Sequence, residues 1–526
     1  MNFFQKYSFL LFLLSASTLF AQKSTIAEED FDRAWYFQNM RNQVYNLDVD
    51  PNWVKDQSGF WYIADTEEGK ICWTVSLYNL EKAEAFDREQ LAQLLRDSLR
   101  IKAQANDLPI QRITWLEEGI IQFRIGTRTF KADMNQNLLR ELKPTSSGYN
   151  PLESSSPNGQ WAAFSQNHNL FLRATETQEE IQLSHQGKKD YEYASDYYWD
   201  DIIEGENGER AERFRVNWSP DSKKILTNIV DFRKGQKMYL LDWSVDTLYR
   251  PRLLSYYRGS PGDTSLIYLK PVVFDVENQK EIPIQIQPVA HFKPVYFDWL
   301  NGGEKLLGIY WERGYKTLHI TVIDPLTGEV TDKYTETSET NIDNQFFTYR
   351  FTQDGKTLFF TSERSGWNHI YRLNLENGEL TQLTEGDFFV SGIKAVDEKA
   401  GIIYFIASGE NPKRNPYHDY FYRIETSGKG MKLLTPEDAN HAVSVSPDYQ
   451  YFVDNYSSIS QPTISVLRNT RNGKLALPLS TADAAKLEKK GGNIRKCLRP
   501  LPGTERRKYT VRSGNLHILT RRNPIL

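Results

Sequence analysis

The stretch from Tyr349 to Phe388, YRFTQDGKTLFFTSERSGWNHIYRLNLENGELTQLTEGDF, decides the fold. Apolar or alternating runs separated by polar turns predict short β-strands, and Gly355 can adopt a positive φ in the first turn at little cost. The first predicted strand ends at Phe351, and the other three cover residues 358–361, 369–373 and 379–383. Four short strands within about 40 residues are typical of one blade of a β-propeller.

The same pattern of an aromatic or β-branched residue, a polar turn and an apolar strand recurs along the chain. Uneven spacing between the repeats indicates that some blades carry insertions. A large β-sandwich with incidental turns is the alternative, but it does not explain why the same turn precedes the same kind of strand. The eight repeats are PNWVKDQSGFWYIA from Pro51, ITWLEEGIIQFRI from Ile113, SSSPNGQWAAFSQ from Ser154, VNWSPDSKKILTN from Val216, FDWLNGGEKLLGI from Phe297, YRFTQDGKTLFFTS from Tyr349, IKAVDEKAGIIYFIA from Ile393 and VSVSPDYQYFVDN from Val443.

The composition excludes some classes of function. The chain has 526 residues, a net charge of −4 and 13% aromatic residues, and it has no basic stripe of the kind that binds nucleic acid. Beyond the N-terminus no run of about 20 apolar residues predicts a membrane span. Its only cysteines, Cys72 and Cys497, allow at most one disulfide, and Cys72 is expected to be a buried thiol.

The N-terminus has the features of a secretory signal peptide over residues 1–21. Lys6 supplies a positive charge, SFLLFLLSASTLF from Ser8 is a short apolar run, and Ala21-Gln22 is a cleavage point, with Ser17 as a second candidate. An uncleaved anchor is the alternative. We therefore expect export, to a periplasm or out of the cell.

Two segments have helical rather than strand periodicity. Phe31, Trp35, Met40 and Val44 recur at helical spacing and predict a helix within residues 22–48. Residues 84–106 predict a second helix, inserted near the first blade.

Residues 184–214 interrupt the repeats with a segment rich in Tyr, Asp and Glu. Acids around aromatic rings can hold a cationic group, because an amine pairs with carboxylates and packs on ring faces. A solvated acidic loop is the simpler alternative.

The sequence lacks the common signatures of catalytic sites. It has no G-x-S-x-G, H-E-x-x-H or C-x-x-C motif and no cluster of metal ligands, so we predict no catalytic residue, no metal and no cofactor in this chain. His369, which begins a predicted strand, is expected to form hydrogen bonds in the core or a loop rather than to catalyse a reaction.

Several motifs resemble the N-terminal domain of the dipeptidyl peptidase IV family of serine exopeptidases over about Glu28 to Lys490. The resemblance implies an eight-bladed propeller followed by an α/β-hydrolase domain with Ser, Asp and His, peptide substrates with a free amino terminus, and a homodimer in the full-length protein. The motifs are SERSGWNHIYRL, RLLSYYRGSPGDTS, VNWSPDSKKI, NPYHDYFYRI and VSVSPDYQYFVD with SVLRNTRNGK.

The family holds the substrate amine with a pair of Glu residues in a propeller insertion. The insertion 184–214 lacks the usual consecutive Glu residues, and Glu204 and Glu206 are the nearest match. The resemblance therefore implies that Glu204 and Glu206 bind the substrate amine, and the altered spacing puts amino-end specificity in doubt.

The last segment departs from the family. Residues 492–526 contain seven Arg, two Lys and one Glu, where the family continues with W-K-x-P-E-x-F-T. Removing the first base of TGG AAA TAT CCG GAA ATG TTT ACG gives codons for GNIRKCLR, which is the sequence from Gly492 to Arg499. A frameshift or a sequencing error near Gly491 is therefore expected, and a genuine basic tail that binds an acidic surface is the alternative.

Together these features predict an all-β, eight-bladed propeller with an N-terminal helix and without the α/β-hydrolase domain. The expected divisions are 1–21 signal peptide, 22–48 helical segment, 49–490 propeller and 491–526 disordered basic tail. The chain is then the truncated propeller portion of a dipeptidyl peptidase, inactive alone. A stand-alone periplasmic propeller that binds a partner protein is the main alternative, and a propeller hydrolase with a central-channel site is a weaker one.

Overall fold

The described part of the chain consists mainly of β-strands. The strands form successive antiparallel sheets, and a few inserted segments interrupt this order. The computed structural model describes residues 31–32, 35, 43–142, 150–197, 203–205, 208–244, 249–287, 289–290 and 295–489. Phe31, Asp32 and Trp35 have helical backbone. Residues 43–48 contain no α-helix, and Tyr45 instead forms an antiparallel bridge with Asp483, so the predicted helix does not extend to Val44. The predicted signal peptide 1–21, the other residues of the predicted helix and the tail 491–526 lie outside the described residues.

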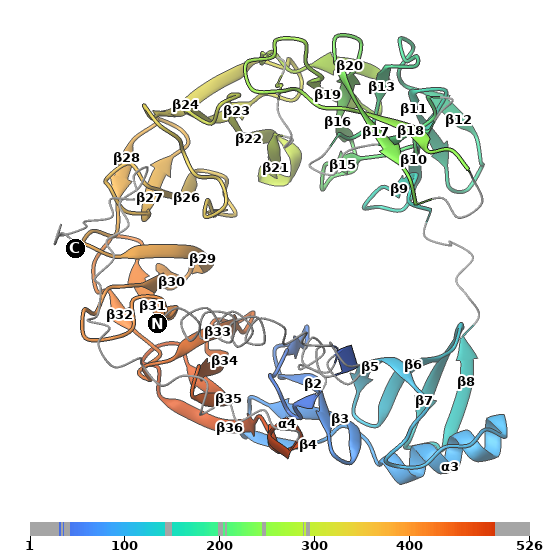
Figure 1. The fold of residues 1–526 in the computed structure, drawn as a ribbon, viewed down its shortest axis with the longest axis vertical. Helices are drawn as coiled ribbons and strands as arrows, with labels where there is room; N and C mark the ends of the chain where they lie inside the picture. The colour runs from blue at the N-terminus through green and yellow to red at the C-terminus, as the bar shows by residue number, and fades with distance from the viewer. Residues whose placement is uncertain are drawn as a thin grey trace, which may run out of the picture.

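Eight sheets of four or five strands follow one another in an arc (Figure 1). The first three sheets contain β1 (Asn52–Trp53), β2 (Gly59–Thr66), β3 (Gly69–Ser76) and β4 (Glu81–Glu84); β5 (Gln111–Glu117), β6 (Ile120–Ile125), β7 (Arg128–Asp133) and β8 (Leu138–Leu142); and β9 (Glu153–Ser155), β10 (Trp161–Gln166), β11 (Asn169–Ala174) and β12 (Glu180–Gln182). The fourth contains β13 (Tyr191–Tyr193), β15 (Val216–Trp218), β16 (Lys224–Asp231), β19 (Tyr268–Asp275) and β20 (Lys280–Pro283).

The other four sheets have consecutive strands in antiparallel order. They contain β21 (Tyr296–Leu300), β22 (Lys305–Trp311), β23 (Thr317–Ile323) and β24 (Val330–Thr337); β25 (Tyr349–Phe351), β26 (Thr357–Ser362), β27 (His369–Asn374) and β28 (Leu380–Gln382); β29 (Phe389–Asp397), β30 (Ile402–Ser408), β31 (Tyr420–Glu425) and β32 (Lys432–Leu433); and β33 (Asn440–Val445), β34 (Tyr451–Ser458), β35 (Gln461–Asn469) and β36 (Leu475–Thr481). Each of the eight sequence repeats overlaps the strand at one edge of a sheet. The described helices are α3 (Arg88–Leu99), the one-turn 3₁₀ helix η2 (Asn301–Gly303) and α4 (Ala485–Lys489).

The strands predicted between Tyr349 and Phe388 are confirmed as β25 to β28, with bounds that differ by one or two residues. Gly355 has φ +65°, as expected for the turn between β25 and β26. A Cβ at this position would also lie 3.1 Å from Leu300 Cβ in the preceding sheet. Glycine therefore suits both the turn and the close approach of the two sheets.

The recurring polar turn has the same hydrogen bonds in several sheets. Ser446 Oγ donates to Asp448 Oδ1 at 2.6 Å and accepts from the Tyr451 N–H at 3.0 Å. The same pair of bonds joins Ser219 to Asp221 and Lys224, and Thr352 to Asp354 and Thr357. In each case the hydroxyl oxygen accepts a hydrogen bond from the first backbone N–H of the strand that follows the turn. This explains why Ser or Thr precedes the acidic residue in these repeats.

Apolar layers between neighbouring sheets form the core. In β26, Leu358 and Phe360 pack toward the β21–β24 sheet, whereas Phe359 packs toward the β29–β32 sheet. Because successive side chains of a strand point to opposite faces, one apolar strand supplies two interfaces. The first and last sheets meet in the same way, through a layer that includes Phe60, Tyr62 and Val453.

Buried apolar layers join seven pairs of neighbouring sheets in the described part of the chain. No such layer among these residues joins the β5–β8 sheet to the β9–β12 sheet. The residues of β6 that lie outside the layer with the first sheet are Ile120, Gln122 and Arg124, and they are only partly buried. The arc therefore has two ends, at β8 and at β9.

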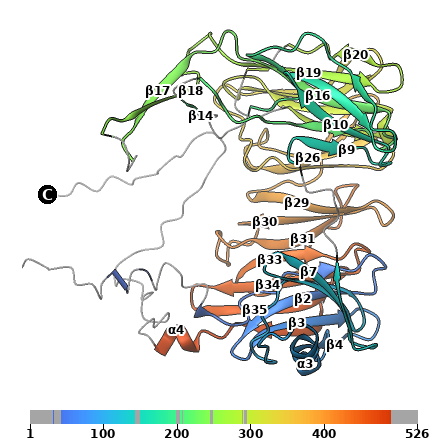
Figure 2. The same ribbon diagram turned by 90° about the vertical axis from the view of Figure 1, so that its right-hand side faces the viewer.

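The fourth sheet carries two insertions. Strands β13 and β15 both pair with β16, so the segment between them interrupts one edge of this sheet. The two insertions together form a three-stranded arm in the order β14-β18-β17. Strand β14 (Ile203–Glu204) comes from the segment between β13 and β15, and β17 (Lys237–Asp242) and β18 (Arg252–Tyr257) come from the segment between β16 and β19. Figure 2 shows the arm projecting from the arc on the same side as α4.

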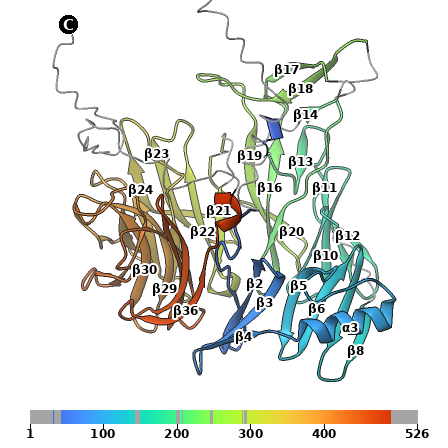
Figure 3. The same ribbon diagram turned by 60° about the horizontal axis from the view of Figure 1, so that its bottom comes forward.

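The predicted second helix is confirmed as α3, which is shorter than the segment 84–106. Asp87 caps its N-terminus by accepting hydrogen bonds from the backbone of Glu89 and Gln90. Leu91 and Leu95 are fully buried in the apolar layer between the β1–β4 and β5–β8 sheets. Figure 3 shows α3 beside the β5–β8 sheet. None of the helices in the described residues is long and apolar enough to cross a membrane.

His369 lies in the core at the start of β27. It is 2% exposed, its Nδ1 lies 3.0 Å from Thr384 Oγ1, and its Nε2 lies 3.1 Å from the Gly386 carbonyl oxygen. The expectation that this histidine forms structural hydrogen bonds is confirmed. Burial lowers the pKa of His369 below its ordinary value, although the bond to Gly386 opposes this shift.

Replacing Ser446 with Ala should lower the free energy of unfolding by about 1–3 kcal/mol, because the Tyr451 N–H loses its buried acceptor. Urea denaturation followed by tryptophan fluorescence measures the change. Ser460→Ala, at an exposed position, is the matched control and should have little effect. Equal losses in the two variants would contradict the role of the turn hydroxyl.

The depressed pKa of His369 predicts that stability is lost as the pH falls. The unfolded chain takes up a proton near the ordinary histidine pKa of about 6.5, whereas the folded chain resists protonation until lower pH. The free energy of unfolding should therefore fall between about pH 7 and pH 5, and His369→Gln should reduce this dependence. His185→Gln, at an exposed position, should leave the dependence unchanged. An identical pH dependence in wild type and His369→Gln would exclude this contribution.

Candidate functional site

The predicted amine-binding residue Glu204 lies at the base of the arm. It belongs to β14, where it pairs with Ser255 of β18, and only 1% of its surface is exposed. Glu206, the other residue predicted from the family resemblance, lies outside the described residues. The prediction that these two residues bind a substrate amine stays a prediction.

Both carboxylate oxygens of Glu204 contact cationic side chains. Its Oε1 lies 2.9 Å from Arg210 Nη1, and its Oε2 lies 2.5 Å from Lys237 Nζ. Burial would raise the pKa of Glu204, but the hydrogen bonds from Lys237 and Arg210 outweigh it and hold the pKa below its ordinary value. Glu204 is therefore a buried carboxylate that stays ionised.

Arg210 joins three acidic residues. Besides Glu204, its guanidinium contacts Glu192, and it lies 3.4 Å from Asp190 Oδ1. The guanidinium carbon also lies 4.2 Å from the centre of the Phe232 ring. Only 10% of the Arg210 side chain is exposed, so this one cation holds β13 and β14 together from the inside.

A second ion-pair group lies on the neighbouring strands. Asp231 accepts hydrogen bonds from Arg233 at 2.7 Å and from Lys270 at 2.6 Å, and both cations lie over the Tyr191 ring. Burial would raise the pKa of Asp231, but the two cations hold it far below its ordinary value. The described acids and rings near the insertion thus bind cations, and these cations belong to the protein itself.

Sequence reasoning found the acids but missed the bases. Arg210 lies six residues after Glu204 within the same insertion, so its charge could have been noticed there. Lys237 lies 33 residues after Glu204, and only the pairing of β17 with β18 and of β18 with β14 brings them together. No local pattern in the sequence signals that contact.

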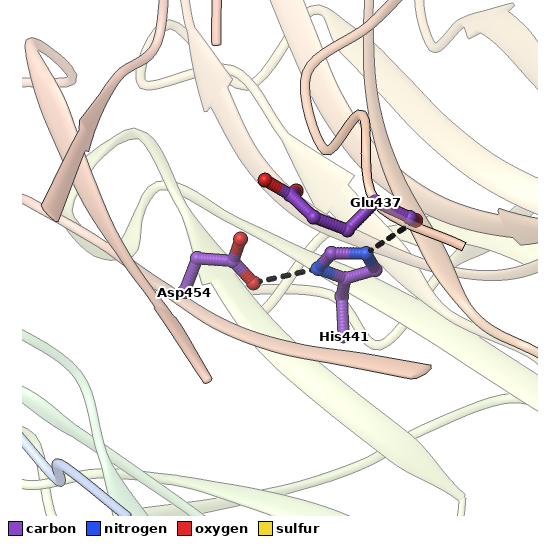
Figure 4. Close-up of side chains that lie close together, drawn as sticks. All are labelled: Glu437, His441 and Asp454. Carbon is purple, nitrogen blue, oxygen red and sulfur yellow. Dashed lines mark hydrogen bonds and ion pairs between the residues drawn. The ribbon is translucent and has the colours of Figure 1, made fainter. Parts of the chain in front are cut away.

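A separate buried cluster joins strands of the last sheet (Figure 4). His441 Nδ1 lies 2.8 Å from Asp454 Oδ1, and its Nε2 lies 3.2 Å from the backbone carbonyl oxygen of Glu437. The side-chain atoms of these three residues lie close enough together to suggest metal ligands. Arg468, however, contacts the Asp454 and Glu437 carboxylates at 2.8 Å each, so it occupies the positions that a metal ion would need. The cluster is an internal ion-pair network.

A cavity of about 670 Å³ lies along β25, β29, β33 and the segment before β1. Its polar lining includes residues of both charges, so it suits a polar ligand better than an apolar one. His441 also lines this cavity, and both of its ring nitrogens lie within hydrogen-bond distance of protein oxygens, Asp454 Oδ1 and the Glu437 carbonyl. The charged and hydroxyl side chains of the lining are Asp48, Asp50, Thr348, Arg350, Ser391, Lys394, Asp419 and Ser444.

Comparison with known proteins identifies the family. Residues 117–463 match the dipeptidyl peptidase IV (DPP IV) N-terminal region. A dipeptidyl peptidase 4 of Trichophyton rubrum is 30% identical over 133 residues, which are 24% of this chain and 16% of that protein. A probable dipeptidyl-aminopeptidase B of Coccidioides posadasii is 26% identical over 178 residues, which are 34% of this chain and 16% of that protein.

Solved structures share the fold. A putative dipeptidyl aminopeptidase IV of Bacteroides ovatus aligns with a TM-score of 0.57 and 18% identity, over 84% of this chain and 60% of that one. Porphyromonas gingivalis dipeptidyl peptidase 4 aligns with a TM-score of 0.58 and 15% identity, over 87% of this chain and 62% of that one. This chain thus spans under two thirds of the structures it resembles. Because the family match extends over most of its length, the chain belongs to the dipeptidyl peptidase IV family, and the matching part is the N-terminal region.

Proposed function

We propose that residues 49–490 form an eight-bladed propeller, the N-terminal portion of a dipeptidyl peptidase IV-like serine exopeptidase. The match of residues 117–463 to the N-terminal region of that family carries this proposal, and the eight successive sheets agree with it. In the full-length protein the propeller would control access of peptides with a free amino terminus. The serine nucleophile would belong to another domain.

We also propose that the protein is exported and that the 526-residue chain is truncated. The basic and apolar start of the sequence supports export to a periplasm or out of the cell. The abrupt change in composition at Gly492 supports a frameshift, after which the family sequence is lost. The chain alone would then bind peptides without cleaving them.

The purified 526-residue chain should release no measurable p-nitroaniline from Gly-Pro-p-nitroanilide, because the sequence offers no nucleophile elbow. Absorbance at the product wavelength measures the rate, and a complete dipeptidyl peptidase of the family serves as positive control. Turnover by this chain that a serine-directed inhibitor abolishes would overturn the proposed inactivity.

We propose further that two copies associate through the arm. Strand β17 is an edge strand of the arm, and an apolar edge strand is a ready template for pairing with another chain. Tyr239, Leu241 and Leu253 are 64%, 55% and 48% exposed on one face of this sheet. Antiparallel pairing of β17 with a second β17 would be self-complementary, as a two-fold dimer requires.

Leu241→Lys should convert the dimer to a monomer, because the charge would have to be buried where two arms pair. Size-exclusion chromatography with light scattering measures the molar mass. Leu326→Lys changes an equally exposed leucine, also 55% exposed, that lies outside the arm, and it should leave the mass unchanged. A monomeric wild-type chain, or equal masses for wild type and Leu241→Lys, would refute association through the arm.

A further inference from the structure

The buried cluster of the last sheet places two hydrogen-bond acceptors against one histidine ring. His441 Nδ1 lies 2.8 Å from Asp454 Oδ1, and its Nε2 lies 3.2 Å from the backbone carbonyl oxygen of Glu437 (Figure 4). An ionised carboxylate and a backbone carbonyl group only accept hydrogen bonds. A neutral imidazole has a single N–H and satisfies one of these contacts, whereas an imidazolium ion donates to both.

Burial makes an unmatched contact at this ring costly. The side chains of His441 and Asp454 are both 0% exposed, so bulk water cannot replace a missing hydrogen bond. With a neutral ring, one nitrogen lone pair would face an oxygen lone pair inside the protein. An unsatisfied buried acceptor destabilises the folded state, and a second ring proton removes this penalty.

The charges of the cluster also favour a second cation. Arg468, whose side chain is 5% exposed, contacts the carboxylates of Asp454 and Glu437 at 2.8 Å each. If His441 were neutral, two carboxylates would share one guanidinium, and one negative charge would be left without a partner. A doubly protonated His441 gives two anions and two cations. Because an uncompensated charge in the interior is strongly destabilising, the balanced state is favoured.

Two tyrosine rings flank the histidine. The ring centres of Tyr420 and Tyr456 lie 5.8 Å and 5.4 Å from the ring centre of His441. The guanidinium carbon of Arg468 lies 5.7 Å from the centre of the same Tyr456 ring. Aromatic rings attract cations within about 6 Å, so Tyr456 favours a positive charge on both neighbours.

Other charged groups approach the ring from the preceding sheet and its connections. Asp438 accepts a hydrogen bond from the Tyr420 hydroxyl at 2.7 Å, and the Arg414 guanidinium carbon lies 5.1 Å from the Tyr420 ring. The Asp419 carbonyl oxygen accepts the His441 backbone N–H at 3.0 Å, and its carboxylate accepts a separate hydroxyl hydrogen bond. These outer groups supply two carboxylates and one guanidinium, so they too favour a cationic ring.

The cluster lies where the last sheet packs on the sheet before it. His441, Asp454 and Arg468 belong to β33, β34 and β35, and Tyr420 belongs to β31 of the preceding sheet. Val453, next to Asp454 in β34, lies in the apolar layer that joins the last sheet to the first. A change in the charge of His441 therefore acts on the sheet that closes the arc onto its first member.

We propose that His441 carries a proton on both ring nitrogens at neutral pH and that loss of one of them destabilises the last sheet. The four-residue network of Glu437, His441, Asp454 and Arg468 is then a pH-sensitive switch built into the fold. Its charges are balanced while His441 is an imidazolium ion. When the ring becomes neutral, Nε2 loses its hydrogen bond and the cluster has an excess negative charge.

Proton linkage gives this switch a definite sign. The unfolded chain releases a histidine proton near pH 6.5, whereas the folded chain keeps the second proton of His441 above that pH. The folded state then binds more protons, so the free energy of unfolding should fall as the pH rises above about 6.5. His369 has the opposite sign and acts below about pH 6.5, so the two contributions occupy different pH ranges.

The first test measures the protonation of the ring directly. Long-range ¹H–¹⁵N correlation spectra of the 526-residue chain, labelled with ¹⁵N-histidine, are recorded at pH 8, where an exposed histidine is neutral. We expect one ring with both nitrogens protonated, and its signals should be absent from the spectrum of His441→Gln. His369 should show one protonated and one unprotonated nitrogen.

The second test measures the consequence for stability. Urea unfolding of wild type and His441→Gln is compared between pH 6 and pH 8.5, because Gln removes the titration while its amide still donates a hydrogen bond. The unfolding equilibrium constant should rise at least about tenfold more in wild type than in the variant. His319→Gln is the matched control, because His319 pairs with Glu312 at 3.1 Å but that carboxylate is 58% exposed. It should keep the wild-type pH dependence.

If His441→Gln does not fold, single Gln replacements of the other seven of the eight histidines assign the doubly protonated ring by exclusion. Retention of its signals in all seven variants would support the proposal, and their loss in any one of them would refute it. An unprotonated nitrogen on His441 at pH 8 would also overturn the proposal. So would an equal pH dependence of unfolding in wild type and His441→Gln.

Discussion

Packing of sheet against sheet is the constraint on which the rest of this structure depends. Nearly every sheet has a neighbour on both faces, so alternate side chains of one strand must both be apolar. Leu306 and Leu307 in β22 are adjacent in sequence and fully buried, yet they belong to layers on opposite sides of the sheet. Such strands cannot carry polar side chains at most positions without loss of stability. Polar and charged side chains that could bind a ligand are therefore expected in turns, inserted segments and the arm.

The repetitive part of the fold could be predicted from the sequence, because its determinants are local. A Ser or Thr before an Asp, a turn and an apolar strand lie within about ten residues of one another, and their hydrogen bonds close within the same turn. The division of one sheet edge into β13 and β15 could not be predicted in this way. It depends on how Tyr193 and Val216, which are distant in sequence, share the partner strand β16.

The candidate site was predicted only in part, for the same reason. Glu204 stood out because its residue type and neighbourhood resembled a family pattern. Its partners Arg210 and Lys237 did not, since arginine and lysine side chains usually face water. Whether an arginine or lysine forms a buried ion pair depends on which carboxylate lies beside it in the folded chain. The arm, formed by strands separated along the chain, supplies that contact.

Arginine has the same organising role in two places. Arg210 binds Asp190, Glu192 and Glu204, and Arg468 binds Asp454 and Glu437. In both clusters a planar guanidinium with several donors links acids from different segments, which a lysine with its single compact charge does less well. The clusters differ in access to water. Asp454 and the His441 side chain are fully buried, whereas the Lys237 end of the other cluster reaches the surface.

Among the described residues no buried apolar layer joins the β5–β8 sheet to the β9–β12 sheet, and this has a mechanical consequence. A closed ring of sheets with an apolar layer at every junction resists any change in the width of its central channel, because opening one junction compresses another. Seven junctions contain a buried apolar layer, whereas the described residues of the eighth form none, so the assembly is a ring of sheets that is open at one junction. Small rotations at the seven other junctions would add up at this open junction, so its width would change without exposing any of the seven apolar layers to water.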